Sequence, residues 1–499
     1  MTEVKKKHPT IEELLEVLKR LFPGADLDMV KLAYEFANLA HQGQRRTNGD
    51  PYITHSLTTA MNLTTMRADL NTIIAGLLHD VPEDTSYTIA DIRKNFGDDI
   101  GNLVEAETKL GTLKYRGMER YVENLRKMFL AISKDVRVIL IKFADRFHNL
   151  ETLDALPPDK QKRIALESME IFAPIALRLG MWETKGKLEN LSFKYTDPDA
   201  YAWVTQLLET TSPSKEKSLA KVMKILQEKL AEQPNLRIAS IQGRSKHLYS
   251  LYKKLLRHER DISKVYDLIA VRVIVEDVSE CYAVLGIIHQ LWKPLRGRIK
   301  DYIAQPKPNG YQSLHTTVFV GPGEIVEFQI RTQGMDDESY YGVAAHWYYT
   351  EQGKPKEGLK MNNPKFAWVN KLLKLQKEIQ DSTEYLESLK VDVFPDNIFV
   401  FTPNGDVIDL PDQATPVDFA YHIHSDIGNH CVASRINDKL MPLSTPLKSG
   451  DVIDIITDKK RARPSPDWLQ FVQTRTARER IKFEINRSRR LFGIFNKKA

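Results

Sequence analysis

The sequence predicts a multidomain protein with an all-helical amino-terminal domain, an α+β domain, a small β-rich domain and a short basic helical tail. Three observations lead to this prediction. The chain has 499 residues, whereas single domains mostly hold about 100 to 200. Apolar residues recur at three- and four-residue spacing up to about residue 190, and strand-like alternation begins only after residue 200. The composition, 42% hydrophobic and 28% charged, is typical of a folded globular protein.

The helical domain is expected over residues 1–195. Thr10 and Glu13 form a capping-box pattern ahead of "IEELLEVLKRLF". Later segments such as "VENLRKMFLAIS" and "KRIALESMEIFAPIALRLG" continue the helical spacing. A break at "TDPDAY" and an irregular stretch at "TTSPSKEKS" are expected to end the helical region.

Strand patterns define the second and third domains, expected over residues 196–390 and 391–458. The segments "DLIAVRVIV" (267–275), "HTTVFVG" (315–321) and "EIVEFQIRT" (324–332) predict strands. A charged, helix-prone link, "KLLKLQKEIQDSTEYLESL", leads to short strands in "NIFVFTPNGDVIDLP" and "GDVIDIITD". Asn404-Gly405 is a good hairpin turn between two of them.

Composition excludes several classes of protein. With two cysteines, Cys281 and Cys431, neither a disulfide framework nor a cysteine-based zinc site can form. No segment approaches the roughly 20 apolar residues that cross a bilayer, and the amino terminus is amphipathic rather than signal-like. We therefore expect a cytoplasmic protein that makes no use of a membrane.

Positive charge is concentrated at the carboxyl end. Residues 459–499, expected to form the helical tail, hold 13 Lys and Arg against three Asp and Glu. Such a segment attracts phosphate backbones and could contact RNA or the ribosome. A solvated helical face with unpaired lysines is the equally weighted alternative.

The first candidate site centres on "LLHDVPEDT" (77–85), where an apolar helix ends in ionisable residues. "KFADRFHNL" and "DPYITHSL" supply further candidates. Two imidazoles and two carboxylates make a mixed nitrogen and oxygen set that suits Mn, Fe or Zn, and a cation held in this way can activate water. Pro82 disfavours helical conformation at Val81, so the helix is expected to stop just after the ligand pair. The four candidate ligands are His55, His79, Asp80 and Asp145.

Each of these residues also has an ordinary interpretation. His79 and Asp80 could be a helix-terminal pair, Glu83 and Asp84 a solvated loop, and His55 a core histidine. The combination favours the metal site.

The second candidate site lacks the P-loop pattern, so any nucleotide must be held by another device. "GRSKHLYSLYKKL" and "RGRIKDYIAQPKPNGYQSLHTT" concentrate basic residues beside aromatics and glycines, which can neutralise triphosphates and stack on bases. On the strand 324–332, Glu327, Gln329 and Arg331 share one face, as an active-site floor would. Asp267 could hold Mg2+. A solvated sheet face and an RNA-binding surface are the alternatives.

The first group of motifs resembles the signatures of the HD hydrolase domain in the long RelA/SpoT homologues, bifunctional enzymes that make and degrade the alarmone (p)ppGpp. "HQGQRRTNGDPYITH", "LLHDVPEDT" and "KFADRFHNL" carry this resemblance. It implies Mn2+-dependent hydrolysis of the 3′-pyrophosphate. Implied roles are Mn2+ ligation by His55, His79, Asp80 and Asp145, handling of water and leaving pyrophosphate by Glu83 and Asp84, and substrate contact by Arg46 and Asn149.

The second group, "GRSKHLYSLYKK", "YDLIAVRVIV", "RIKDYIAQPKPNGYQSLHTTV", "VEFQIRT" and "GVAAHW", is similar to the family's synthetase motifs. The resemblance implies a nucleotidyltransferase-like α+β domain that transfers pyrophosphate from ATP to the 3′-hydroxyl of GDP or GTP with Mg2+. Asp267 would bind Mg2+, Glu327 would activate the acceptor hydroxyl or help to bind the metal, and Gln329 would support it. Implied nucleotide contacts are Arg244 and Arg272 flanking adenine, Tyr311 stacking on guanine, and Lys246, Lys254, Arg298, Lys300, Lys307, Asn309 and His315 at phosphates and ribose.

Some positions depart from the family pattern. Pro82 replaces a usual aliphatic residue, and Thr47 stands where a basic residue often holds the guanine. Asp336, Ser339 and Tyr340 stand where the family usually has His, Ala and Glu.

Residues 391–458 resemble a TGS domain of β-grasp type. "FVFTPNGDVIDLPDQATPVDFAYHIHSDIGNHC" and "LKSGDVIDIIT" carry this resemblance. It implies contact with deacylated tRNA on the ribosome, with His424 as the tRNA contact. A complete chain of this length would lack the family's later zinc-finger and ACT domains.

The leading hypothesis is therefore a bifunctional (p)ppGpp synthetase and hydrolase in the stringent response. The alternatives are a hydrolase with a weak or silent synthetase, and a ribosome- or tRNA-binding regulator with inert catalytic domains. The oligomeric state is not predicted.

Overall fold

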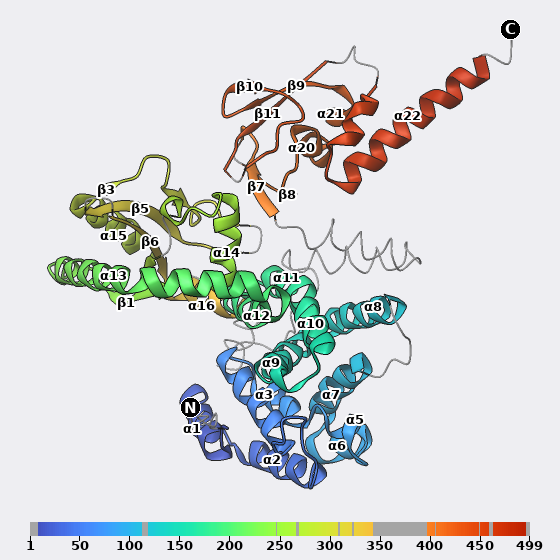
Figure 1. The fold of residues 1–499 in the computed structure, drawn as a ribbon, viewed down its shortest axis with the longest axis vertical. Helices are drawn as coiled ribbons and strands as arrows, with labels where there is room; N and C mark the ends of the chain where they lie inside the picture. Colours follow the sequence, from blue (N-terminus) through green and yellow to red (C-terminus); the bar gives the residue numbers. More distant parts are fainter. Residues whose placement is uncertain are drawn as a thin grey trace. The chain divides into compact units, whose positions relative to one another are not determined.

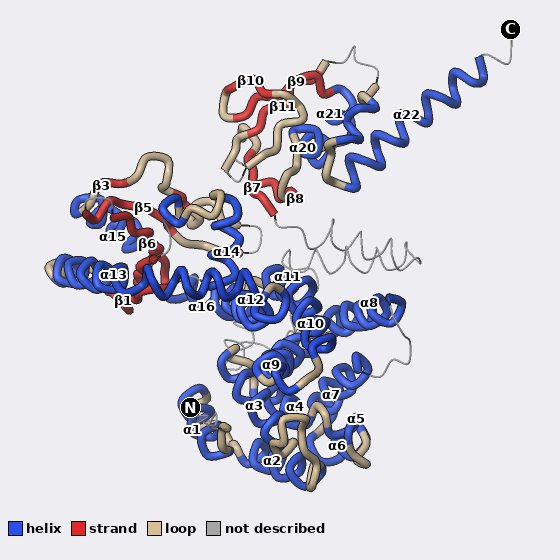
Figure 2. Tube along the Cα trace, viewed as in Figure 1, coloured by secondary structure: helices blue, strands red, loops and turns tan. Residues whose placement is uncertain are grey.

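The computed structural model describes residues 8–111, 118–245, 247–265, 269–307, 310–321, 324–342, 397–404, 406–448, 450–458 and 463–495. The chain divides into two compact units, Met1–Val369 and Asn370–Ala499. The first unit contains a helical part and a six-stranded sheet, and the second contains two small sheets with helices (Figure 1, Figure 2).

In residues 8–111 and 118–196 of the first unit the regular elements are helices, as the sequence predicts, and one isolated bridge joins Arg45 and Pro51 (Figure 2). The capping box at Thr10 and Glu13 is present, with each side chain bonded to the other residue's backbone N–H. The α-helices are α1 (Ile11–Leu21), α2 (Asp28–Ala40), α3 (Ile53–Thr65), α4 (Leu70–Leu78), α5 (Val81–Asp84), α6 (Ile89–Phe96), α7 (Asp98–Gly111), α8 (Met118–Lys134), α9 (Arg137–Glu151), α10 (Pro158–Glu167), α11 (Ala173–Arg178) and α12 (Trp182–Thr196). A 3-10 turn, η1 (Leu153–Ala155), and a π-helical turn, η2 (Ser168–Phe172), complete them.

Two of these helices lie at the centre of the core. In α4, every residue from Thr72 to Leu78 is buried. In α9, the buried residues include Phe143, Ala144, Asp145 and His148. Helices buried on all sides have no solvated face, so polar residues on them need internal partners.

The expected irregular stretch "TTSPSKEKS" is wrong, because the helix α13 (Pro198–Ala231) runs through it. The break at "TDPDAY" is correct: Asp197 caps α13, and its side chain accepts a hydrogen bond from the Ala200 N–H. A proline inside a helix costs about 3 kcal/mol. Burial of both halves of α13 outweighs this cost, since Val204 packs in one apolar cluster while Val222 and Leu226 pack against the sheet.

The sheet of the first unit has the strand order β1-β2-β6-β5-β3, with β4 paired to β5. The pair β2–β6 is parallel and the other pairs are antiparallel. The elements of this part are β1 (Ile238–Ser245), α14 (Leu248–Arg257), η3 (Ile262–Lys264), β2 (Ile269–Val275), α15 (Val278–Leu291), β3 (Lys293–Pro294), β4 (Lys300–Asp301), β5 (Leu314–Gly321), β6 (Glu324–Thr332) and α16 (Gln333–Tyr341). The three strands expected here from sequence are confirmed within a residue or two.

One face of this sheet is apolar and covered by helices. Val222 and Leu226 of α13, Val284 of α15, and Phe328 and Ile330 of β6 belong to one buried cluster. The alternate residues of β2 and β6 therefore point to the opposite face, which carries Arg272 of β2 and Glu327, Gln329 and Arg331 of β6.

The second unit contains a hairpin, β7 (Asn397–Phe401) with β8 (Val407–Pro411), and a three-stranded sheet of order β10-β9-β11. Gly405 of the predicted hairpin turn and the predicted helical link over residues 371–389 lie outside the described residues. The remaining elements are α20 (Pro416–Ile423), α21 (Ser425–His430), β9 (Cys431–Ile436), β10 (Lys439–Met441), β11 (Ile453–Thr457), η6 (Pro466–Gln470) and α22 (Arg475–Phe495).

The basic tail helix α22 is anchored to this unit rather than free along its whole length. Ala477 and Ile481 of α22 pack with Val417 and Ala420 of α20. The buried Asp418 carboxylate accepts hydrogen bonds from the Gln473 and Thr474 backbone, and so satisfies N–H groups ahead of α22.

Within the described ranges, every helix is too short or too polar to span a bilayer.

Candidate active sites

Three helices bring the predicted metal ligands together. His55 lies in the first turn of α3, His79 and Asp80 follow the last residue of α4, and Asp145 lies in the middle of α9. Because α3 and α9 both pack against α4, residues far apart in sequence meet at one point.

Pro82 ends α4, but not in the way the sequence predicted. Val81 was expected to be non-helical, whereas it begins the short helix α5 with Pro82 in its first turn. A proline is well tolerated at that position, because its missing N–H would have no intrahelical partner there. The same missing N–H cannot bond to the Leu78 carbonyl, so the hydrogen-bond ladder of α4 is interrupted.

The ligand atoms of His55, His79 and Asp80 all lie within 4.8 Å of one another. His55 Nε2 is 3.3 Å from Asp80 Oδ2 and 3.2 Å from Asp145 Oδ1, and His79 Nε2 is 3.3 Å from Asp80 Oδ1. His55, His79 and Asp145 are at most 5% exposed. Three of the predicted ligands, His55, His79 and Asp80, therefore converge at one point, and Asp145 adjoins them through its contact with His55.

The hydrogen bonding of His79 fits a metal ligand. Its Nδ1 lies 2.8 Å from the Gly76 carbonyl oxygen, so Nδ1 carries a proton and donates it. A neutral imidazole then has a lone pair on Nε2, which is buried and makes no hydrogen bond. This nitrogen and the Asp80 carboxylate oxygen 3.3 Å away would together offer a divalent cation one nitrogen and one oxygen ligand.

A lysine inside the core supports the carboxylates. Lys142 Nζ lies 2.7 Å from Glu107 Oε1 and 3.2 Å from Asp145 Oδ2. Burial alone would favour protonated Asp145, but the Lys142 charge and the neighbouring histidines hold the pKa of Asp145 well below its usual range. Asp145 is thus an ionised oxygen donor.

The two acidic residues beside the cluster, Glu83 and Asp84, lie in different environments. Burial, together with the nearby Glu107, raises the pKa of Glu83 to about 7. Asp84 Oδ2 instead lies 2.6 Å from the Tyr52 hydroxyl, which is also 2.9 Å from Asp80 Oδ2. Glu83 is therefore suited to proton transfer near neutral pH, while Tyr52 fixes Asp84.

The predicted substrate contacts lie next to the cluster. Arg46 Nη2 donates to Asn149 Oδ1 at 2.7 Å, and Asn149 Nδ2 donates to Asp145 Oδ1 at 2.5 Å. Arg46, Thr47, Arg146 and Asn149 line a cavity of about 280 Å3 that reaches Asp145. A phosphorylated ligand in this cavity would meet two guanidinium groups.

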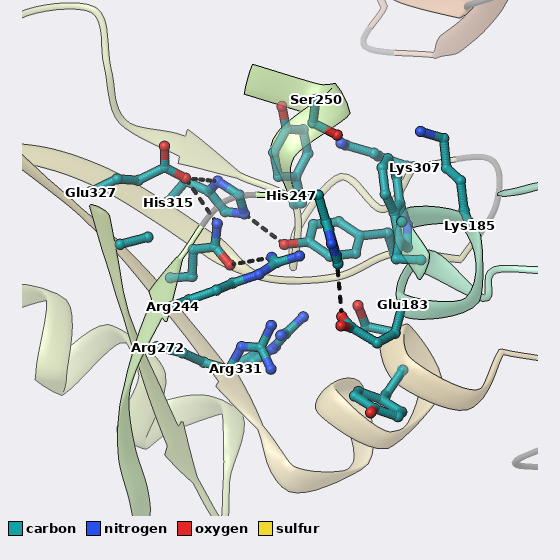
Figure 3. A pocket seen from close by; sticks show the side chains of 18 of the residues that line it. Glu183, Lys185, Arg244, His247, Ser250, Arg272, Lys307, His315, Glu327 and Arg331 are labelled. Atoms are coloured by element: carbon teal, nitrogen blue, oxygen red, sulfur yellow. Dashed lines mark hydrogen bonds and ion pairs between the residues drawn. The ribbon is translucent and has the colours of Figure 1, made fainter. Parts of the chain in front are cut away.

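The second site lies on the face of the sheet opposite the apolar cluster of α13, α15 and β6, around a cavity of about 370 Å3 (Figure 3). Strand register assembles it: Arg272 pairs with Gln329 and Ala270 with Glu327 across β2 and β6, and His315 of β5 pairs with Gln329. Of the predicted residues, those lining the cavity are Arg244, Lys254, Arg272, Lys300, Lys307, Tyr311, His315, Glu327 and Gln329.

A chain of hydrogen bonds crosses this cavity floor (Figure 3). The Tyr311 hydroxyl lies 2.8 Å from His315 Nε2, and His315 Nδ1 lies 2.9 Å from Glu327 Oε1. Gln329 Nε2 also donates to Glu327 Oε1, at 3.0 Å. Burial lowers the pKa of His315, so this imidazole is neutral, donates to Glu327 and accepts from Tyr311. Glu327 is thereby fixed as an acceptor.

Lys307 is enclosed by aromatic rings. Its ammonium nitrogen lies 4.6 Å from the Tyr302 ring centre, 4.9 Å from that of Tyr311 and 5.5 Å from that of Trp182. Cation–π attraction favours the charged form, but burial and the nearby Lys300 lower the pKa of Lys307 to about 8.

Arg331 is a pocket residue whose side chain is only 1% exposed. Its Nη2 lies 2.7 Å from Asp336 Oδ1 of α16, and Arg272 Nη1 lies 3.3 Å from the same oxygen. Burial and the neighbouring Arg331 lower the pKa of Arg272 to about 10. Asp336 thus offsets two of the cations that face the cavity.

The helix α12 forms one wall of this cavity. Trp182, Glu183 and Lys185 line it. Trp182 packs against Tyr311 with ring centres 6.0 Å apart, and Glu183 Oε2 lies 3.6 Å from His247 Nε2.

The other predicted site residues lie elsewhere. Arg298 lines an adjoining cavity of about 230 Å3 that shares Lys254, Lys300 and Glu327 with the first. Lys246, Asp267 and Asn309 lie outside the described residues. His424 is exposed at the start of α21, where its Nδ1 accepts a hydrogen bond from the Asp426 N–H.

Three known domains match the chain in order. Residues 33–182 match the HD domain, residues 243–354 the region found in RelA/SpoT proteins, and residues 398–457 the TGS domain. A Synechocystis protein named as a probable guanosine-3′,5′-bis(diphosphate) 3′-pyrophosphohydrolase is 45% identical over 92% of this chain and 60% of its own length. The Escherichia coli protein named bifunctional (p)ppGpp synthase/hydrolase SpoT is 44% identical over 94% of this chain and 66% of its own length.

The chain belongs to the RelA/SpoT family.

Among solved structures, small alarmone synthetase 2 from Bacillus subtilis is 25% identical and covers 35% of this chain and 98% of its own, with a TM-score of 0.24. The family matches and the observed elements confirm the predicted fold class: a helical HD domain, an α+β domain and a small β-rich TGS domain. The chain spans about 60% of the length of the Synechocystis relative.

In this RelA/SpoT chain, several residues that contribute to the sites were not predicted. Tyr52, Lys142 and Trp182 touch the predicted groups, but each sits in an ordinary apolar or helical pattern that gives no sign of this. Arg331 was recognised on the polar strand face without being assigned a role. Only the tertiary contacts identify these four residues.

Because the pKa of Lys307 is lowered, its ammonium group should lose its proton at a lower pH than an ordinary lysine does. Competitive acetylation followed by mass spectrometry should give half-maximal reactivity of Lys307 near pH 8, against about 10.4 in the urea-unfolded chain. Between these values the unfolded chain holds the additional proton, so the contribution of this group to folding stability increases as pH rises. A midpoint near 10.4 in the folded chain would contradict the burial described here.

Proposed function

We propose that this chain is a bifunctional alarmone enzyme. Its HD domain would hydrolyse the 3′-pyrophosphate of (p)ppGpp to GDP or GTP and pyrophosphate. Its synthetase domain would transfer pyrophosphate from ATP to the 3′-hydroxyl of GDP or GTP. Relatives bearing the names of both activities support this reading. The domain limits proposed are 195/196, 390/391 and 458/459.

The observation that carries the proposal is the buried convergence of His55, His79 and Asp80, with the His79 Nε2 lone pair directed at no hydrogen-bond donor. A core that buries such groups without a purpose loses stability, because unpaired polar atoms cost about 1–3 kcal/mol each. The proposed occupant is Mn2+, with Asp145 as a further ligand. When bound, this cation would supply Lewis acidity toward water and the 3′-diphosphate.

In hydrolysis, the water oxygen would bond to the phosphorus attached to the ribose 3′-oxygen, and the bond from that phosphorus to the 3′-oxygen would break. Glu83 is suited to hold or release the proton that the 3′-oxygen needs, since its pKa of about 7 lies near neutral pH. Arg46 and Arg146 would neutralise the phosphates, and Asn149 would orient Arg46.

In synthesis, Glu327 would accept the proton of the 3′-hydroxyl as the 3′-oxygen bonds to the β-phosphorus of ATP. The bond from that phosphorus to the oxygen that bridges it to the α-phosphorus would break, and AMP would leave. Glu327 is positioned to accept the proton by hydrogen bonds from His315 and Gln329. Mg2+, with Asp267 as its proposed ligand, would neutralise the transferred diphosphate. Arg244 and Arg272 are proposed to flank adenine and Tyr311 to stack on guanine, while Lys254, Lys300 and Lys307 would hold phosphates.

A specific observation favours a second candidate, a hydrolase with a weak synthetase. Asp336 stands where the family usually has His, and its carboxylate forms ion pairs with Arg272 and Arg331. This internal anion offsets positive charge that would otherwise attract the triphosphate of a nucleotide in the cavity.

Contact with deacylated tRNA and the ribosome is proposed for the TGS domain. The exposed imidazole of His424 is held by its hydrogen bond from the Asp426 N–H, and basic residues of α22 follow in the same unit.

Paired assays on one preparation test the two activities. Asp80→Asn should lower Mn2+-dependent hydrolysis about a hundredfold or more and leave Mg2+-dependent synthesis unchanged, because it removes one ligand charge at constant volume. Glu327→Gln should have the opposite effect. Loss of both reactions in either variant would contradict separate sites, and silence of the unsubstituted chain in both assays would favour the inert regulator.

The effect of the Asp336 charge is tested by Asp336→Asn. Removing the Asp336 charge should make the free energy of ATP binding more favourable by about 1 kcal/mol, which is roughly a fivefold increase in affinity, as measured by calorimetry. The matched control is Asp337→Asn on the same helix, since Asp337 pairs with Arg67 of the HD domain at 3.3 Å and does not line the cavity. Equal ATP affinity in Asp336→Asn and the unsubstituted chain would rule out this effect.

The TGS proposal predicts that His424→Ala weakens binding of deacylated tRNA by about tenfold in a filter-binding assay at fixed salt, as loss of one good contact costs about 1–3 kcal/mol. His430→Ala, on the same short helix, is the control. If both variants bind like the unsubstituted chain, His424 is no tRNA contact.

A further inference from the structure

His148 lies directly behind the proposed metal ligand His55. The Nδ1 atoms of the two imidazoles are 2.8 Å apart, and the rings lie nearly parallel, with centres 5.0 Å apart. His148 is 5% exposed and comes from α9, three residues after Asp145. The opposite side of His55, Nε2, faces Asp80 and Asp145.

The short distance between the two nitrogens limits where protons can be. Two ring nitrogens at 2.8 Å require one proton between them, because two protons would collide and two lone pairs would repel. A cation on His55 Nε2 needs the lone pair there, so the proton of neutral His55 has to be on Nδ1. His55 Nδ1–H then donates to the His148 Nδ1 lone pair, and His148 carries its own proton on Nε2.

We infer that His148 is a positioning residue: as an uncharged hydrogen-bond acceptor, it fixes the tautomer and ring orientation in which His55 Nε2 can bind the cation. This inference rests on the proposed function, because it concerns the metal of the proposed hydrolase site. The sequence pattern gives no sign of it, since "ADRFHNL" places His148 on an apolar helix face.

The other proposed histidine ligand, His79, is oriented by a hydrogen bond of the same kind to a different acceptor. His79 Nδ1 donates to the Gly76 carbonyl oxygen, which is also uncharged. Glu107 and Asp145 already place carboxylates close to Lys142, and Asp80 adds another beside both histidines. A neutral acceptor behind each imidazole orients the ligand without adding negative charge to a buried site.

The experiment compares Mn2+ affinity in two variants of the full chain by isothermal titration calorimetry. His148→Leu keeps the volume and removes the acceptor, and it should weaken Mn2+ binding about 10- to 100-fold. His148→Asn places Oδ1 near the lost Nδ1, and it should restore affinity to within about threefold of the unsubstituted chain. The control His289→Leu removes a half-buried imidazole of α15, remote from the site, and should bind Mn2+ normally.

A purely structural role for His148 is distinguished by the metal-free chains. Their melting temperatures report lost packing, whereas the increase on adding Mn2+ reports binding. Equal Mn2+ affinity in His148→Leu and the unsubstituted chain would overturn the inference, as would an Asn variant no better than the Leu variant. Absence of Mn2+ binding by the unsubstituted chain would overturn the proposed function itself.

The protonation of the His55 ring nitrogens can also be measured in the unsubstituted chain, which tests the inference if a His148 variant does not fold. With 15N-labelled histidine and Zn2+ as a diamagnetic probe, the His55 signal, assigned by its loss in His55→Gln, should show a proton on Nδ1 and none on Nε2. A proton on Nε2 of His55 would contradict the inference.

Discussion

The helical domain depends on keeping charged groups inside a core. The central helix α9 is buried on nearly every side, yet it carries Lys142, Asp145 and His148. An isolated buried charge costs several kcal/mol, so each of these groups has to meet a partner. Lys142 joins Glu107 to Asp145, and Asp145 faces His55. Because Glu107 lies on α7 and His55 on α3, the positions of α7 and α3 around α9 are constrained by charge pairing as well as by apolar packing.

The proposed synthetase site follows from strand geometry instead. Because side chains alternate along a strand, Glu327, Gln329 and Arg331 share a face. The helices α13 and α15 cover the other face, and these three residues line the cavity. This arrangement could be predicted from the sequence of β6 alone. The period of two also predicts that Val326, Phe328 and Ile330 form the core, and they do.

Other parts could not be predicted, for identifiable reasons. Continuity of α13 through "TTSPSKEKS" depends on what each half of the helix packs against, which local propensity does not record. Helical conformation at Val81 depends on whether Pro82 falls in the first turn of a helix or inside one. Trp182 and Tyr52 contribute through contacts with residues far away in sequence.

The helix α12 has a consequence for how the protein can be divided. It packs against α9 and α10 within the helical domain, while Trp182, Glu183 and Gly186 at its start form a wall of the cavity over the sheet. An excised sheet domain beginning after this helix would open the cavity to solvent beside Tyr311 and expose the Lys307 ammonium to water. The sheet residues alone thus do not make up the complete binding surface, and an isolated fragment would underreport what the intact polypeptide can hold.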